Sequence, residues 1–310
     1  MDGSVANPQP FKAILLRLGA ALALSTMAML IKLGGEHGVH LTELIFWRQA
    51  IATVMVVAFL AMVGRIGTVK TKRFKTHFRR AFLGFISTCF LYGTILLLPL
   101  AEATAINFTA PFFAVMLSVI LFRETVGIYR WSAVALGFAG VLVVTQPGGG
   151  GVINPLGVGT GLIGAFFVAL ISYHIQDLNK TESPWSIVFW FGALSAPMAG
   201  IFVPFFGSAH DQTTWLIILS MGVAGAIAQL LITASLRFGS AATIIIIDYT
   251  SLLWAVTYGW TIFDAPPSAG LWLGAPLILG AGLLVAWRER VIARKARQER
   301  ELEPDGPLAH

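Results

Sequence analysis

The sequence predicts an all-α integral membrane protein with ten transmembrane helices, arranged as two inverted five-helix repeats around a central cavity. Three observations lead to this fold class. Of the 310 residues, 56% are hydrophobic and only 12% are charged, whereas soluble domains carry roughly 25% charged residues. The apolar residues fall into ten runs of membrane-spanning length, and landmarks of the first half of the chain recur in the second half.

A helix needs roughly 20 apolar residues to cross the ~30 Å hydrocarbon layer. The first run contains Arg17, ends in Lys32 and has no small-residue cleavage pattern, so it fits a retained span better than a signal peptide. Weak breaks separate the third span from the fourth and the eighth from the ninth. The expected spans are 13–33, 42–63, 81–99, 102–122, 128–146, 157–178, 184–207, 214–237, 240–263 and 268–287.

The placement of Lys and Arg supports an even number of spans with both termini in the cytoplasm, because basic loops stay cytoplasmic. With ten spans, 19 of the 21 basic residues lie in inner loops and tails or, as for Arg17 and Arg237, at the inner ends of helices. The other two, Lys32 and Arg48, lie inside spans or at their outer ends. We therefore expect an integral protein of a bacterial inner membrane.

The densest basic stretch is KTKRFKTHFRR at 70–80, between the second and third spans. Phe74, Phe78 and Phe82 recur every four residues, which favours a short interfacial helix on anionic lipid over a nucleic-acid site. The tail at 288–310 mixes both charge signs and is expected to be a solvated helical extension. The single cysteine excludes a disulfide within the chain.

An internal repeat divides the chain. At an offset of 140, NFTAPFFAVMLSVILFRE (107–124) lies over IDYTSLLWAVTYGWTIFD (247–264), and IFWRQA parallels VFWFGA at an offset of 143. Because five spans is an odd number, the second copy enters the bilayer from the opposite side, as in many secondary transporters with sites near the midplane. The expected order is an N-terminal cytoplasmic tail (1–12), a first repeat (13–146), an outer connecting loop (147–156), a second repeat (157–287) and a charged cytoplasmic tail (288–310).

Five segments carry a resemblance to a known family. They are ELIFWRQA, AEATAINFTAPFFAVMLSVILFRE, RWSAVALGFAGVLVV, IIIIDYTSLLWAVTYGWTIFD and WLGAPLILGAGLLVAW. Over roughly residues 13–287 the chain resembles the EamA-type family of the drug/metabolite transporter superfamily. The resemblance implies a ten-helix carrier whose fifth and tenth helices pack outside the other eight, and whose relatives import or export amino acids, riboflavin, S-adenosylmethionine and other small metabolites.

The chain departs from that family pattern in the ninth and closing segments. A proline often precedes the Asp-Tyr-Thr triplet and a Gly-Glu pair often closes the ninth span, but Ile246–Ile247 and Phe263–Asp264 stand there. The pattern therefore does not predict a helix hinge at this point.

Asp248 follows four isoleucines in the ninth span. An ionised Asp at a helix centre costs about +2.5 to +3.5 kcal/mol on insertion scales, so it should face the bundle or a watery cavity. Burial disfavours the charged form of a carboxylate, which makes Asp248 a candidate for both substrate binding and proton coupling. The alternative is a structural carboxylate hydrogen-bonded to a neighbouring helix. The expected polar stripe is Ala241, Asp248, Ser251, Ala255 and Gly259, with Ile246, Leu253 and Trp260 on the opposite face.

Arg48 lies about six residues inside the outer end of the second span, roughly 9 Å deep at the helical rise. Its planar guanidinium suits bidentate binding of a substrate carboxylate, while snorkelling to headgroups or pairing with Glu43 are the alternatives. Lys32 and Arg17 are expected to be anchors in the outer and inner headgroups.

His174 lies near the inner end of the sixth span, within a turn of Asp177. Because imidazole titrates near neutral pH, His174 is a second proton-coupling candidate. An ordinary interfacial histidine is the alternative.

Several neutral side chains complete the candidate substrate site. Asn107 and Thr109 precede Pro111, which frees backbone carbonyls for a ligand or neighbour. Tyr92 and Gln229 are further candidates, with helix-to-helix hydrogen bonding as the alternative role. Of five aromatic candidates, Tyr249 and Trp254 lie deepest and are favoured for stacking on a flat cargo, because aromatic residues at span ends usually form the interfacial belt. The other three are Trp47, Trp190 and Tyr258.

These features together favour a secondary transporter that exports a small polar or zwitterionic metabolite such as an amino acid by alternating access, with proton coupling as an option. An importer of riboflavin or S-adenosylmethionine is the alternative, and a membrane-embedded enzyme on a lipid-linked substrate is a remote one. A channel or membrane sensor would favour rings of charge contributed by an oligomer. The sequence contains no GxxxxGK[ST] motif for ATP. We expect no enzymatic activity, cofactor or metal, and either a monomer or a homodimer.

Overall fold

The computed structural model describes residues 10–123, 127–146, 153–235 and 247–302. Arg237, Ala241 and Ile246 lie outside the described residues, as does most of the connecting loop. Every regular element within these ranges is a helix. They are α1 (Pro10–Glu36), α2 (Leu41–Met62), η1 (Ile66–Val69), α3 (Phe74–Leu97), α4 (Leu100–Asn107), α5 (Ala110–Phe122), α6 (Ile128–Thr145), α7 (Pro155–Asn179), α8 (Pro184–Gly200), α9 (Val203–Phe206), α10 (Gln212–Ser235), α12 (Ser251–Phe263) and α13 (Ala269–Leu302).

Eight of the described helical segments are long and apolar enough to cross a membrane. One of them, Leu100–Leu121, consists of α4 and α5 together. The other two expected spans, 184–207 and 240–263, correspond to α8 with α9 and to the segment that ends in α12. α8 has only 17 residues and contains Pro197. The all-α membrane fold is therefore confirmed, and the count of ten spans stays a prediction.

The first turns of α3 correct the expected boundary of the third span. We expected a separate interfacial helix at 70–80, but α3 runs without interruption from Phe74 to Leu97. No glycine or proline interrupts the chain between Phe74 and Phe82, so the helix continues from the loop into the span. The side chains of Phe74, Phe78 and Phe82 are 46% to 49% exposed and form one outward stripe on α3 itself.

Short polar and proline signals set the starts of the helices in the second repeat. Asn154 caps α7 by accepting a hydrogen bond from the N–H of Leu156, and Pro155 occupies the first turn. Ser183 caps α8 in the same way through the N–H of Ser186. These arrangements satisfy N–H groups that a helix start leaves unpaired.

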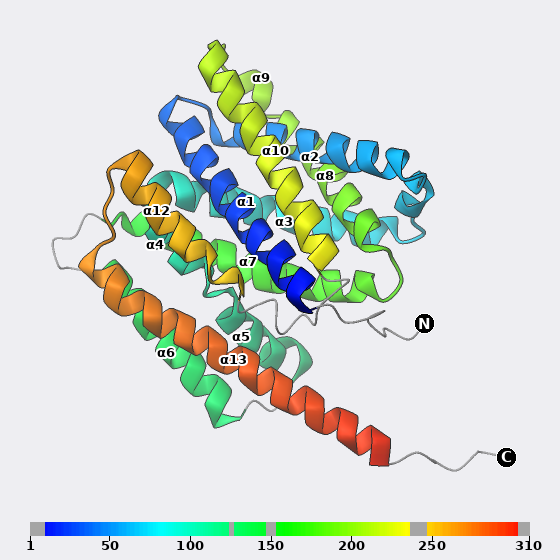
Figure 1. Cartoon of the computed structure of the whole chain (residues 1–310), viewed down its shortest axis with the longest axis vertical. Coiled ribbons are helices and arrows are strands. Elements are labelled where there is room, and N and C mark those ends of the chain that lie inside the picture. The colour runs from blue at the N-terminus through cyan, green and yellow to red at the C-terminus, as the bar shows by residue number, and fades with distance from the viewer. Residues whose placement is uncertain (1–9, 124–126, 147–152, 236–246, 303–310) are drawn as a thin grey trace.

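The contacts between helices show that a pseudo-two-fold symmetry relates the two halves. α1 of the first half packs along α10 of the second, and α3 packs along α7, so first and third spans exchange partners between the halves. α2 packs against its equivalent α8, and α6 against its equivalent α13. Figure 1 shows α6 and α13 side by side along one edge of the molecule. This outer position of the fifth and last helices agrees with the arrangement that the family resemblance implies.

The structure corrects the register of the repeat in its second part. Thr109 and Thr250 precede α5 and α12, and Arg123 and Asp264 follow them in the left-handed conformation. Both pairs are 141 positions apart, and α6 and α13 also begin 141 positions apart. The expected offset of 140 was therefore wrong by one residue, and the aligned position of Asp248 is Asn107. The two repeats have few identical residues, and their segments remain aligned apolar to apolar after a shift of one residue, so the sequence alone does not reveal this error.

Small residues let the two outer helices approach closely. A Cβ atom at Gly274 of α13 would lie 2.5 Å from the backbone oxygen of Gly140 on α6. Direct backbone packing of this kind is a common way for membrane helices to associate, because lipid offers no hydrophobic drive between them.

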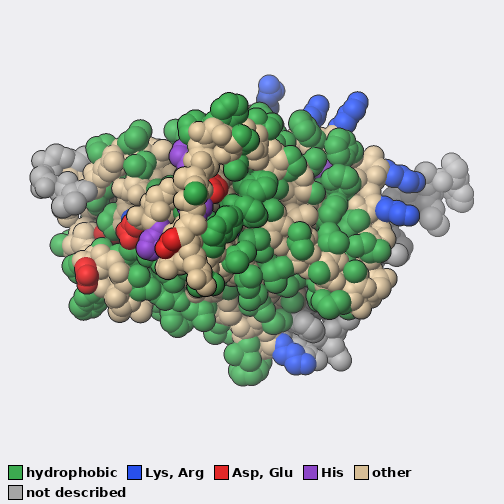
Figure 2. Space-filling view, turned by 90° about the horizontal axis from the view of Figure 1, so that it is seen from above, with side chains coloured by type: hydrophobic (Ala, Val, Ile, Leu, Met, Phe, Trp, Pro, Cys, Tyr) green, Lys and Arg blue, Asp and Glu red, His purple; other side chains and the backbone are tan. Residues whose placement is uncertain are grey.

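The exposed surface has the charge pattern of a membrane protein. Figure 2 shows hydrophobic side chains over much of the visible face, with Lys and Arg toward one end and Asp, Glu and His toward the other. Leu253 and Trp260 of α12 are 68% and 61% exposed, whereas Ala255 and Gly259 are buried. The described part of the predicted α12 stripe is thereby confirmed. The orientation of the termini in the membrane stays a prediction.

Candidate functional site

Two equivalent helix breaks meet near the centre of the bundle. The hydroxyl of Thr109 donates to the carbonyl of Ile106 at 2.7 Å, and the hydroxyl of Thr250 donates to the carbonyl of Ile247 at 2.6 Å. Each threonine so satisfies a carbonyl at the end of one helical segment. The ninth span is interrupted before α12 without the proline of the family pattern, and the Thr250 hydroxyl satisfies a carbonyl at this break.

The aligned residues Phe108 and Tyr249 touch each other across the two breaks. Their ring centroids lie 4.9 Å apart and the rings are edge to face at 78°. Contact between equivalent residues places them at the pseudo-two-fold axis. Asn107, one position earlier, keeps its side-chain oxygen Oδ1 buried without a hydrogen-bond partner. The breaks therefore position polar groups where the two halves meet.

Asp248 forms a bidentate ion pair with Arg17 of α1. Arg17 Nε donates to Oδ1 and Nη2 donates to Oδ2, each at 2.5 Å. The Arg17 side chain is 13% exposed and the Asp248 side chain 33%. The expected inner-headgroup anchor role of Arg17 is therefore wrong, because its guanidinium points to a carboxylate inside the protein. Asp248 faces the bundle, as its insertion cost required.

The favoured aromatic residues lie apart from each other. The buried hydroxyl of Tyr249 has no hydrogen-bond partner and points to Gly282 of α13, where a Cβ atom would overlap it. Trp254 is 37% exposed and its ring lies 6.5 Å from that of Tyr258. The Tyr258 hydroxyl in turn lies 2.9 Å from that of Thr26 on α1. The structure does not bring Tyr249 and Trp254 to one stacking site.

Arg48 on α2 is held by a chain of polar contacts to α8. Its Nη1 donates to Gln49 Oε1 at 2.5 Å, and Gln49 Nε2 donates to Ser195 Oγ at 2.6 Å. The Nε atom of Arg48 is buried without an acceptor, so the side chain does not snorkel to the headgroups. Pairing with Glu43 is also wrong, because Glu43 Oε1 lies 2.8 Å from Nε2 of His210.

Arg80 is a half-buried cation that the sequence did not single out. Its guanidinium carbon lies 3.8 Å from the ring centroid of Phe191 on α8. The Nε and Nη1 atoms are buried and have no hydrogen-bond partner. The residue belonged to the expected basic loop, and the early start of α3 moves it into the span. The sequence did contain a signal for this position. Arg80 lies four residues before Gly84, so on a continuous helix both residues share one face.

Tyr92 and Gln229 lie on the helices that flank Arg48. Tyr92 on α3 is buried, its hydroxyl has no hydrogen-bond partner, and the charge of Arg48 acts on it. Gln229 on α10 is half-buried. It lies one turn from Gly225, where a Cβ atom would lie 3.2 Å from Arg48 Nε. By helical spacing Gln229 shares the face of α10 that is directed toward α2.

The remaining charged candidates make structural contacts. His174 Nδ1 lies 3.2 Å from the carbonyl of Leu170 on its own helix, and its neighbour Asp177 pairs with Arg73 at 2.5 Å. Lys32 donates to the carbonyl of Leu98 at 2.9 Å. Its expected role as a headgroup anchor is wrong, because it caps the carbonyl end of α3, where a cation is favoured.

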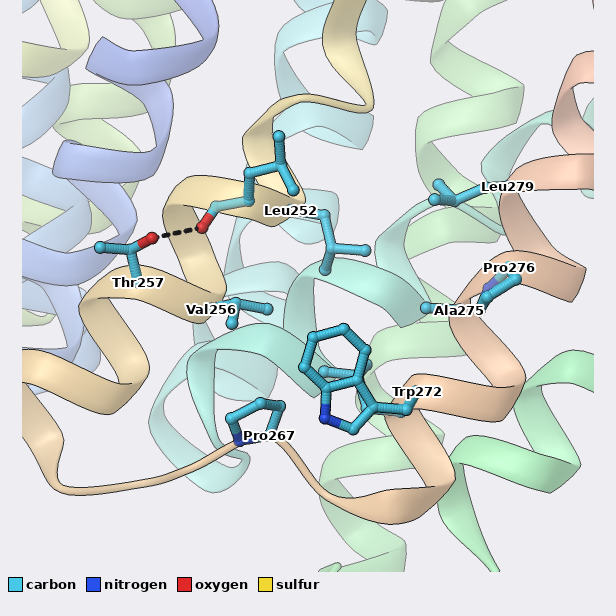
Figure 3. Close-up of a pocket in the computed structure, with 10 residues that line it drawn as sticks. Leu252, Val256, Thr257, Pro267, Trp272, Ala275, Pro276 and Leu279 are labelled. Atoms are coloured by element: carbon cyan, nitrogen blue, oxygen red, sulfur yellow. Dashed lines mark hydrogen bonds between the residues drawn. The ribbon is translucent and has the colours of Figure 1, made fainter.

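A separate groove lies between α12 and α13 (Figure 3). Its volume is about 340 Å³ and its lining is apolar. Its polar side-chain groups are the Thr257 hydroxyl, which donates to the carbonyl of Leu253 at 2.8 Å within its own helix, and the indole N–H of Trp272. This lining offers few partners to a polar cargo, so we place the candidate site with the buried polar groups near the breaks and Arg48.

An all-α membrane protein with inverted halves and unpaired polar groups at their junction has the construction of a secondary transporter. The model of the EamA-like transporter family matches residues 11–146 and 155–287. The chain therefore belongs to this family, and the resemblance seen in the sequence is confirmed.

Known relatives extend over nearly the whole chain. A riboflavin transporter of Vibrio cholerae is 28% identical over 299 residues, covering 94% of this chain and 98% of the relative. A pseudopaline exporter of Pseudomonas aeruginosa is 24% identical, covering 86% and 93%. An S-adenosylmethionine uptake transporter of Rickettsia bellii is 24% identical, covering 81% and 85%. A solved crystal structure shares the fold at a TM-score of 0.60 and 19% identity, covering 91% of this chain and 96% of that chain.

Proposed function

We propose that the protein is a secondary transporter that exports a small polar or zwitterionic metabolite by alternating access of its two repeats. The observation that carries the proposal is the exchange of helix partners between the halves, α1 with α10 and α3 with α7. When two halves are related in this way, each can adopt the conformation of the other, which opens the shared centre to one side or the opposite side.

The buried polar groups support a polar cargo. Arg48, Tyr92 and Asn107 each keep a buried polar atom that lacks a hydrogen-bond partner. Buried polar groups are nearly always paired in native proteins, and an unpaired one costs about 1–3 kcal/mol. A bound metabolite that pairs with these atoms would recover that cost.

Proton coupling through Asp248 depends on Arg17. Both carboxylate oxygens accept hydrogen bonds from the Arg17 guanidinium, so proton exchange at Asp248 competes with this ion pair. We propose that a conformational step separates α1 from the break before α12 and allows the exchange. His174 has no comparable contact with the other candidates in the described residues.

Import is the second candidate for the direction, and the relatives supply the observation in its favour. The uptake transporter and the exporter are equally similar to this chain, at 24% identity. Riboflavin is the alternative cargo, because the Vibrio cholerae relative is named for it.

Counterflow in proteoliposomes tests the proposal. Liposomes loaded with an unlabelled amino acid, riboflavin or S-adenosylmethionine receive the labelled compound outside, and we expect transient accumulation of label for the true cargo. Arg48→Gln should abolish this exchange, while Lys70→Gln, a change at an exposed loop position, should retain it. The absence of exchange for every compound that binds the protein would refute a carrier cycle and leave a channel, sensor or enzyme.

Direction is measured separately, in membrane vesicles of known orientation with an imposed proton gradient. Export predicts uptake into inside-out vesicles when their lumen is acidic. Uptake confined to right-side-out vesicles would reverse our assignment.

A further inference from the structure

The charge balance inside the described spans is uneven. Each of three carboxylates there already has a partner. They are Glu43, Glu102 and Asp248, whose partners are His210, the backbone N–H of Ser268 and Arg17. Arg48 and Arg80 form no ion pair with any described carboxylate. Two permanent positive charges therefore lack a counter-charge within the part of the chain that the structure describes.

Both arginines are linked to α8, Arg80 by direct contact with Phe191 and Arg48 through Gln49. Gln49 donates to Ser195, and the Ser195 hydroxyl donates to the carbonyl of Phe191. The guanidinium carbon of Arg80 lies 3.8 Å from the centroid of the Phe191 ring. Arg80 and the hydrogen-bond partner of Arg48, Gln49, therefore contact α8 one turn apart.

The geometry around Arg80 is built for this stacking. A Cβ atom at Gly84 would lie 2.6 Å from Cε2 of Phe191, so the glycine permits the ring to lie against α3. The ring occupies one face of the planar guanidinium and leaves its edge free. The buried Nε and Nη1 atoms lack acceptors, and unpaired guanidinium N–H groups are suited to donate charge-assisted hydrogen bonds to an oxyanion.

The two charges also act on each other. Arg48 exerts an electrostatic effect on both Arg80 and the Tyr92 hydroxyl. Like charges held close together are unfavourable, and so are buried guanidinium N–H groups that lack an acceptor. An anion close to both guanidinium groups removes the repulsion and supplies the missing acceptors.

We infer that Arg48 and Arg80 bind an anionic group of the transported metabolite, a carboxylate or a phosphate. The inference rests on the proposed transport function, because it assigns the anion to the cargo. It narrows the cargo to molecules with at least one oxyanion, and two unneutralised arginines favour a dianion over a simple zwitterion.

Binding of matched anionic and neutral probes tests the inference. The full-length protein is purified in a phospholipid-free detergent and titrated with succinate, with its neutral diamide succinamide, and with inorganic phosphate. We expect succinate or phosphate to raise the melting temperature and succinamide to have no effect. Arg48→Gln and Arg80→Gln should each weaken the affinity by at least about tenfold, which corresponds to 1.4 kcal/mol.

Arg79→Gln is the matched control. Arg79 is adjacent on the same helix but exposed, so its substitution should leave the affinity unchanged. Equal binding of succinate and succinamide, or full affinity in Arg80→Gln, would overturn the inference. Stabilisation by phosphatidylglycerol alone, lost in Arg80→Gln, would identify a lipid headgroup as the anion and would equally overturn the cargo assignment.

The ligand-free protein gives a second readout, which separates a binding role from a structural one. Arg80→Met keeps an aliphatic side chain on the Phe191 ring and removes the unpaired charge. Replacing buried charges by apolar residues is often neutral or stabilising, so the ligand-free melting temperature should not fall. A fall of more than about 5 °C would assign Arg80 a structural role.

The failure of this inference is distinguishable from the failure of the transport proposal. Counterflow of a neutral cargo without anion binding would refute the anion site alone. Tight anion binding without counterflow of any compound would refute transport and the assignment of the anion to a cargo, while the anion site itself would stand.

Discussion

Because Arg17 and Asp248 form an ion pair, substitutions of these two residues should not have additive effects on the free energy of unfolding, although the residues are far apart in the sequence. The ion pair joins α1 to the break before α12 through two hydrogen bonds of 2.5 Å. Hydrogen bonds to charged groups contribute about 1.5–3 kcal/mol each in favourable cases, and breaking a fully buried ion pair costs about 3–5 kcal/mol. Because the Asp248 side chain is 33% exposed, solvent screening reduces both figures. We expect a loss of about 2 kcal/mol for either Arg17→Gln or Asp248→Asn.

The assay is reversible unfolding in mixed micelles, in which an ionic detergent is titrated against a mild one and tryptophan fluorescence is followed. The double variant should cost little more than either single variant, which gives a coupling energy of about 1–2 kcal/mol. Additive losses, with a coupling below about 0.5 kcal/mol, would refute the argument, because they would show that the two side chains do not stabilise each other in the folded protein.

Two further predictions concern other parts of the molecule. Gly282→Ala should destabilise the protein by about 1–3 kcal/mol, because the added Cβ overlaps the Tyr249 hydroxyl. Adding Tyr249→Phe to this variant should recover part of the lost stability. Gly280→Ala is the control and should be tolerated, because the space around its Cβ is open. Equal losses at both glycines in the same unfolding assay would contradict the packing argument. At the start of α10, hydrogen bonds from the side chain and backbone of Thr214 lower the pKa of Asp211 below its usual range. A lowered carboxyl pKa stabilises the folded state above the unfolded pKa of about 4, and the benefit is lost as the pH falls through the folded value. The melting-temperature difference between the protein and Asp211→Ala should therefore shrink below about pH 4, and a difference that is constant from pH 7 to pH 3 would exclude this role.

The membrane fold and the repeat followed from the sequence because they depend on one-dimensional patterns. Runs of apolar residues, basic loops and recurring landmarks need no knowledge of which helix faces which. The inward stripe on α12 is confirmed for the same reason, since helical spacing alone places Ala255 and Gly259 opposite Leu253.

The partners of the charged residues did not follow from the sequence. Arg17 and Asp248 are 231 positions apart, and their contact depends on the rotation and depth of two helices from different halves. Arg80 was assigned to a loop because the run of basic residues hid the early start of α3. The alignment of the two repeats was wrong by one residue because both offsets, 140 and 141, place apolar residues over apolar residues in the segment that follows Asn107.

The corrected register has a consequence for the energetics of the transport cycle. The two breaks have equivalent positions in the repeat, yet the first half carries Asn107 where the second carries Asp248, which pairs with Arg17 of the first half. In the proposed alternating-access cycle, two chemically identical halves would make the two opposite-facing conformations equivalent by two-fold symmetry, with equal populations. The ion pair between Arg17 and Asp248 has no counterpart at Asn107, so we expect the resting protein to favour one orientation by the free energy that this ion pair contributes.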